Sequence, residues 1–196
     1  MEVVVGVTAG SPWDSLEVTK LIVSALTPVT VAVLGVIFAY ALKRADGRQW
    51  FSQKLVEKRI DLMGQMLPEL NDLLCYYTWI GEWQKIPPPE VVARKRRLDK
   101  LFFANRSFFS RATGDAYQSF MNTLFETYVG PGRGPRLRTG VTSRHGDRRS
   151  ALESEWLPEW SQLFLPESDQ ASRWEVRRAY DALLAALGAE IGVKTR

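Results

Sequence analysis

The sequence contains a single cysteine and a single histidine among its 196 residues. One cysteine, Cys75, excludes an internal disulfide and fits a reducing compartment. One histidine, His145, excludes a zinc site built from several His and Cys ligands, and the chain has no HExxH, CxxC or GxSxG motif. Cys75 falls inside a predicted helix, far in sequence from His145, which favours a buried structural thiol. We therefore expect no metal, no cofactor and no catalytic residue of these classes.

Charged residues are absent from Leu21 to Leu42, which read LIVSALTPVTVAVLGVIFAYAL. A helix of this length measures about 33 Å, enough to cross a hydrocarbon core of about 30 Å. The hydroxyls of its serine and threonines can return hydrogen bonds to the backbone, and Pro28 is tolerated in such helices. The run predicts a single transmembrane helix at residues 21–42.

Two other interpretations of the run are a cleaved signal peptide and the core helix of a soluble domain. The signal peptide has one argument, because residues 39–41 (Ala-Tyr-Ala) fit a small-x-small cleavage site. Against it, the residues ahead are mostly acidic, the apolar core exceeds the roughly 7–15 residues of a signal peptide, and Lys43-Arg44 follow at once. The retained anchor is favoured.

The basic residues indicate the orientation of this anchor. All Lys and Arg residues except Lys20 follow the run. By the positive-inside rule, residues 1–20 form a short extracytoplasmic N-terminus and the C-terminal part is cytoplasmic, in the inner or plasma membrane of a prokaryotic cell. Residues 43–49 form a juxtamembrane linker, with Gly47 as a hinge or within a continuous helix. Small residues spaced by four, three and four form a seam for self-association of the span: Pro28, Ala32, Gly35 and Ala39.

The remainder, residues 50–196, has helical periodicity and no long alternating pattern typical of strands. A stripe predicts a helix over 49–84, kinked at Pro68: Val56, Ile60, Met63, Leu67, Leu70, Leu74 and Tyr77. Further helices are predicted from Pro89 or Glu90, over 113–129, from a capping box at 150–153 (SALE), and over 168–191, with 172–175 (SRWE) as a second possible start. The fold class is all-α, with a compact helical-bundle cytoplasmic domain of about five helices.

A basic Gly/Arg loop is expected at residues 130–150, without regular structure. Arginine forks suit phosphates and carboxylates, so six arginines are candidate anion ligands: Arg133, Arg136, Arg138, Arg144, Arg148 and Arg149. A phosphate loop matches poorly, because two prolines remove backbone donors and no Gly-Lys-Ser/Thr follows. The alternative is a solvated basic loop lying on the anionic inner leaflet.

A second basic feature lies on the helix that follows KIPPPE. One of its faces is basic: Arg94, Lys95, Arg96, Arg97 and Lys100. This face is either an anion-binding patch or the solvated side of an amphipathic helix. The positive excess after Leu42 is mild, so we expect no nucleic-acid partner, although contact with anionic lipid headgroups fits.

Taken together, these features predict a single-pass membrane-anchored helical interaction protein without catalytic activity. It would be an adaptor or a self-assembling membrane effector, binding a cytoplasmic protein or copies of itself. The alternative is a membrane-tethered sensor that binds an anionic ligand (a nucleotide, a lipid headgroup or a nucleic-acid backbone) through the arginine-rich loop. A carboxylate-based hydrolase is a third class, but the spacing of the acidic residues singles out no pair.

Overall fold

The computed structural model describes residues 15–127 and 134–193, except for the side chains of 15–19, 21–30 and 41–51. The expectations for residues 1–14 and for Arg133 therefore lie outside the described residues. The chain divides into two compact units, Met1–Ser52 and Gln53–Arg196. Each unit is described by itself.

The first unit contains the beginning of helix α1 (Ser15–Thr78). All side chains from Val31 to Tyr40 are exposed, and none is charged. Among the described residues, no helix combines the length and the apolar character that crossing a membrane requires. The predicted span at 21–42 includes 21–30 and 41–42, whose side chains lie outside the described residues. Residues 43–49 are helical, so Gly47 lies within a continuous helix.

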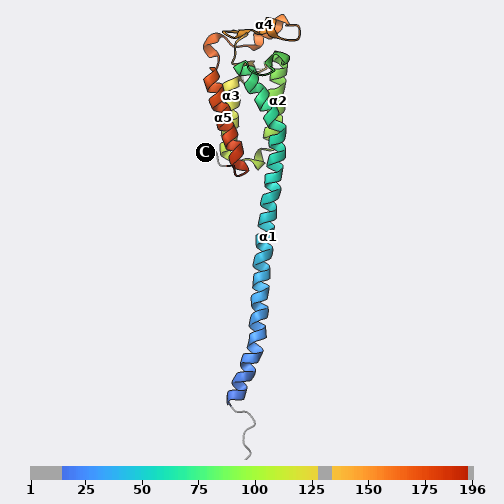
Figure 1. Ribbon diagram of the computed structural model, residues 1–196, viewed down its shortest axis with the longest axis vertical. Coiled ribbons are helices and arrows are strands. Elements are labelled where there is room, and N and C mark those ends of the chain that lie inside the picture. The colour runs from blue at the N-terminus through green and yellow to red at the C-terminus, as the bar shows by residue number, and fades with distance from the viewer. Residues whose placement is uncertain (1–14, 128–133, 194–196) are drawn as a thin grey trace, which may run out of the picture. The chain divides into compact units, whose positions relative to one another are not determined.

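The second unit is a helical bundle. The C-terminal part of α1 is followed by α2 (Pro88–Ala104), α3 (Arg111–Leu124) and α5 (Arg173–Glu190), and consecutive helices run in opposite directions (Figure 1). Shorter helical elements connect them: η1 (Trp83–Lys85), η2 (Arg106–Phe108), α4 (Arg148–Ala151), η3 (Pro158–Leu163) and η4 (Glu167–Asp169). The predominance of helix confirms the predicted class in outline.

Two short antiparallel strand pairs interrupt this helical architecture. β1 (Phe125–Glu126) pairs with β2 (Arg136–Leu137), and β3 (Thr142–Ser143) pairs with β4 (Gly146–Asp147). The prediction that residues 130–150 lack regular structure is therefore wrong for β2, β3, β4 and α4. For β2 the physical reason is that Leu137 is buried in the core, where backbone polar groups must be paired. The Leu137 carbonyl accepts from the Leu165 amide at 2.9 Å, and the Arg138 amide donates to the Leu124 carbonyl at 2.8 Å.

Helix ends differ from the predicted ones where the backbone turns. α1 stops at Thr78 instead of 84, because Trp79 and Gly81 adopt the left-handed region with φ of 59° and 60°. The Ile80 amide donates back to the Cys75 carbonyl at 3.1 Å and satisfies an end group of the helix. The third helix stops at Leu124, because the chain extends there into β1.

The predicted capping box at 150–153 is wrong. Asp147 caps α4 by accepting from the Arg149 amide, so Ser150 lies inside this short helix. The box at 172–175 is confirmed, because Ser172 accepts from the Glu175 amide while the Glu175 carboxylate accepts from the Ser172 amide.

The core of the second unit is built from the predicted stripe of α1 and from aromatic side chains of α2 and α3. Met63, Leu70 and Tyr77 are buried, whereas Ile60, at the N-terminal end of the stripe, is 51% exposed. The rings of Phe102 and Tyr117 stack with centroids 4.0 Å apart. This core holds α1, α2, α3 and α5 together and positions the polar clusters between them.

Candidate functional site

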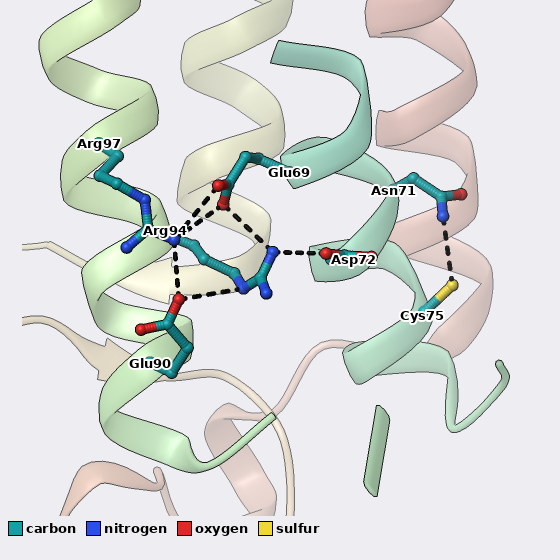
Figure 2. A network of polar contacts seen from close by, with 7 residues as sticks. All are labelled: Glu69, Asn71, Asp72, Cys75, Glu90, Arg94 and Arg97. Carbon is teal, nitrogen blue, oxygen red and sulfur yellow. Dashed lines mark hydrogen bonds and ion pairs between the residues drawn. The ribbon is translucent and has the colours of Figure 1, made fainter. Parts of the chain in front are cut away.

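A network of ion pairs joins α1 to α2 (Figure 2). Arg94 contacts Glu69 at 3.3 Å and Glu90 at 3.5 Å, and it also donates to Asp72. Arg97 contacts Glu69 at 3.1 Å and Glu90 at 2.8 Å. Helical spacing brings these groups together, because Glu69 and Asp72 are three residues apart on α1, while Glu90, Arg94 and Arg97 follow one face of α2.

The two arginines of this network differ in their exposure. The Arg94 side chain is 19% exposed and that of Arg97 is 50% exposed. Arg94 therefore bridges carboxylates of both helices in a partly desolvated position, where a charge-assisted hydrogen bond is stronger than on the surface. The arrangement fixes the register of α2 against α1.

A groove of about 390 Å³ lies beside this network and contains Cys75. Asn71 contacts the Cys75 sulfur at 3.7 Å (Figure 2). Burial and the charge of Asp72 raise the pKa of the thiol, against the lowering effect of Asn71, so the thiol stays protonated and is a poor nucleophile at neutral pH. We expected a buried structural thiol, but Cys75 has intermediate exposure. The groove opens to solvent between the end of α1 and the segment before α2.

A second cluster, the aromatic cage, surrounds Arg148 at the end of α1. The Arg148 side chain is buried, with 1% exposure, among three rings. Its guanidinium carbon lies 4.0 Å from the centroid of Tyr76, 3.8 Å from that of Trp79 and 5.1 Å from that of Trp83. It donates to the carbonyls of Gly140 at 3.0 Å and of Tyr76 at 2.9 Å.

The buried charge of Arg148 forms no ion pair with a carboxylate of the described chain. The faces of the three rings and the negative carbonyl end of α1 stabilise it instead. Burial lowers the pKa of Arg148 to about 10, and burial raises the pKa of Tyr76 to about 12. At neutral pH the arginine is therefore charged and the tyrosine neutral, so the cage is a cation–aromatic contact.

A third cluster is a buried ion pair between α1 and the C-terminal end of α5. Arg59 contacts the Glu190 carboxylate at 2.9 Å and donates to the Glu190 carbonyl at 2.8 Å. The same carboxylate accepts from the Ser110 amide and the Thr113 hydroxyl, each at 2.6 Å. Burial by itself raises the pKa of Glu190, but these hydrogen bonds and the charge of Arg59 outweigh it and leave the pKa below its ordinary value.

The structure does not gather the described loop arginines around one pocket. Arg148 is buried in the cage, and each of the other four has a different contact. Arg136 pairs with Glu126 at 2.6 Å, and Arg149 pairs with Asp147 at 3.0 Å. Arg138 donates to the Asp169 carbonyl at 3.2 Å, and Arg144 donates to His145 at 3.1 Å. Arg133 lies outside the described residues. The prediction of a wholly solvated basic loop is therefore wrong at Arg148, and the sequence did not predict the aromatic cage around it.

The predicted basic face of α2 is only partly solvated. Arg96 and Lys100 are exposed, whereas Lys95 is 7% exposed, pairs with Asp99 and lies 5.7 Å from the ring of Phe125. The expected solvated position of Lys95 is wrong, because the aliphatic stem packs on the core while the ammonium reaches a carboxylate at i+4.

The predicted packing seam lies in the first unit. Ala32, Gly35 and Ala39 are exposed on α1, and the side chain of Pro28 lies outside the described residues. Within the described part of the chain, no three His, Cys, Asp or Glu residues are placed to hold a metal ion.

Comparisons of the chain with models of known protein families, with curated proteins and with solved structures find no significant match.

Proposed function

We propose that this chain is a single-pass membrane-anchored interaction protein. Its helical second unit would bind a cytoplasmic partner or copies of itself, and the uncharged run at 21–42 would hold it at the membrane. The observation that supports the anchor most directly is the exposure of every side chain from Val31 to Tyr40, a stretch of α1 without a charge.

The exposed stretch is apolar on all sides of α1. Val31, Val36 and Ile37, which point in different directions around the helix, are 64%, 68% and 57% exposed. A helix that is apolar all round is covered by lipid or by protein, because each square ångström of exposed apolar surface costs about 25 cal/mol in water. The uncharged run continues on both sides of this stretch, to Leu21 and Leu42.

The second unit supports a binding role because buried and partly buried arginines hold its helices and loops together. Arg94 joins α2 to α1, Arg59 joins α1 to α5, and Arg148 holds residues 139–148 against the end of α1. These contacts make a preformed scaffold. Its surface carries large exposed apolar side chains, among them Phe103 at 55% and Trp174 at 65%, which a partner can cover.

Membrane extraction of full-length protein from expressing cells tests the anchor. We expect the protein to stay with the membrane pellet in alkaline carbonate and to dissolve in detergent. The double substitution L34R/I37R should release it, since each charge at the centre of a span costs about 2.5–3.5 kcal/mol. The matched control S161R/Q162R adds the same charge on exposed positions of η3 and should stay in the pellet. Carbonate extraction of the wild type would overturn the anchor.

Labelling with a membrane-impermeant maleimide tests the orientation. The assay needs only one background substitution, since Cys75 is the only cysteine. In a C75A background, A9C should react in intact cells, whereas S161C should react only after lysis. Labelling of S161C in intact cells would reverse the proposed orientation.

Native mass spectrometry of the gently extracted protein tests the interaction role. A second protein at fixed stoichiometry supports an adaptor, and a homo-oligomer supports a self-assembling effector. A monomer without any bound protein would contradict both forms.

A further inference from the structure

We propose that Arg144, His145 and Arg173 form a binding site for a phosphate monoester. The Nε of Arg144 lies 3.1 Å and the Nη1 of Arg173 lies 2.7 Å from the Nε2 of His145. The site joins the turn between β3 and β4 to the first residue of α5. It does not depend on the proposed membrane anchor.

The two guanidinium groups converge without a neutralising carboxylate. In the described part of the chain, neither Arg144 nor Arg173 forms an ion pair with Asp or Glu. The two nearest acidic residues along the chain are engaged elsewhere: Asp147 pairs with Arg149 at 3.0 Å, and Glu175 accepts from the Ser172 amide at 2.8 Å. Two cations that share one imidazole repel each other, and a bound anion removes that repulsion.

The groups are held in place before any ligand arrives. Arg173 donates through its Nη2 to the Thr78 carbonyl at the end of α1, and this contact leaves its Nη1 directed at His145. The backbone amide of His145 donates to the Ser143 hydroxyl at 3.0 Å and shapes the β3–β4 turn. Such preorganisation reduces the entropic cost of binding. The positive N-terminal end of α5 adds to the field at Arg173.

The donor set fits phosphate better than carboxylate. The two forked guanidinium groups meet at the Nε2 of His145. A phosphate monoester that takes the place of the imidazole offers three terminal oxygens to them, where a carboxylate offers two. Such a monoester is carried by small phosphorylated metabolites and also by the headgroup of phosphatidic acid. Trp174, exposed and stacked on Arg178 at 5.0 Å, follows Arg173 directly and would reach into the headgroup layer in the lipid case.

Proton NMR of the full-length chain in neutral detergent tests the site, because His145 is the only histidine and gives a single imidazole C2–H resonance in a protein without a histidine tag. Titration with inorganic phosphate should shift this resonance saturably. R144Q should weaken binding by about tenfold or more, the effect of losing one charge-assisted hydrogen bond. The matched control R149Q removes an exposed arginine that pairs with Asp147 and should bind like the wild type.

Titration of lipids into the detergent micelles separates the two sources of the phosphate. A shift of the His145 resonance by phosphatidic acid, but not by phosphatidylglycerol, assigns a lipid headgroup, and a shift by inorganic phosphate without such lipid selectivity assigns a soluble monoester. Arg173 also caps α1, so its substitution could disturb the fold, and the R144Q variant decides the proposal instead. As a folding control, the helicity of R144Q must match that of the wild type. The proposal is overturned if phosphate causes no saturable shift, or if R149Q weakens binding as much as R144Q.

Discussion

The guanidinium carbon of Arg148 lies 3.8 Å from the centroid of the Trp79 ring, and Trp79 is the non-glycine residue of the described chain with positive φ, at 59°. This backbone conformation is rare for a bulky residue and costs about 1–3 kcal/mol, so the surrounding contacts must compensate for it. It ends α1 and turns the indole onto the arginine. The same Trp79 conformation therefore ends the helix and covers the buried Arg148.

Substitution of Arg148 should strongly destabilise the second unit. R148A removes three cation–aromatic contacts and leaves the carbonyls of Gly140 and Tyr76 without their donor. We expect a loss of about 3–5 kcal/mol in the free energy of unfolding, because a cavity and unpaired buried carbonyls arise together. Urea unfolding followed by tryptophan fluorescence measures this loss, since two of the cage residues are tryptophans.

The neighbouring Arg149 supplies the matched control. Its side chain is 53% exposed and pairs with Asp147 at the surface. R149A should change the free energy of unfolding by about 1 kcal/mol at most, as exposed ion pairs do. Equal effects of R148A and R149A would show that the cage does not stabilise the unit.

The sequence predicted most of the helices because their signals are local. The stripe on α1 identifies Met63, Leu70 and Tyr77 as core residues, and SRWE identifies the start of α5. The SALE motif failed because capping motifs compete, and Asp147 starts a helix before Ser150 is reached. The short strands were missed because two-residue pairs have no periodicity and form only where β2 meets the end of α3.

The polar clusters were harder to predict, because partners far apart in sequence create them. Nothing local distinguishes Arg148 from Arg149, yet one is buried among rings contributed by residues 76–83 and the other is exposed. The same holds for Arg173, which meets His145 across 28 positions. Residue type identifies arginines as candidate anion ligands, but only the fold shows which of them already have partners.

Substitution of two glycines of the second unit by alanine should change the free energy of unfolding in opposite directions. Gly64 lies exposed inside α1, where a Cβ would meet nothing within 4 Å, so G64A should stabilise by about 0.5–1 kcal/mol. Gly81 has a φ of 60°, and its Cβ would meet the Cys75 sulfur at 3.3 Å, so G81A should destabilise by about 1 kcal/mol or more. Thermal unfolding of both variants checks the pair, and a stabilising G81A would contradict the described turn.

The two arginines of the α1–α2 network should contribute unequally. R94A removes a partly buried bridge to Glu69, Asp72 and Glu90 and should cost about 1–3 kcal/mol. R97A removes a half-exposed partner of Glu69 and Glu90 and should cost less than about 1 kcal/mol. Urea unfolding at low and high salt measures both, and the cost of R97A should decrease more with salt than that of R94A. Equal costs would argue against the bridging role of Arg94.

The ion pair between Arg59 and Glu190 should make stability depend on acid pH. The pKa of Glu190 is lower in the folded chain than its ordinary value near 4.5, so the unfolded chain binds the proton more readily. The stabilisation is therefore fully present above the ordinary pKa and is lost as the pH falls through the lower folded value. At about pH 7, E190Q should cost about 3–5 kcal/mol, because Arg59 then remains partly buried without its counter-charge.

Measuring urea unfolding of the wild type and E190Q from about pH 7 down to about pH 3 checks this dependence. The difference between the two proteins should shrink on acidification, since protonated Glu190 resembles glutamine in charge. E57Q is the control, because Glu57 forms an exposed pair with Lys54 and should give a small difference at every pH. A difference for E190Q that stays constant over this range would mean that the Glu190 carboxylate does not have the lowered pKa that its contacts with Arg59, Ser110 and Thr113 produce.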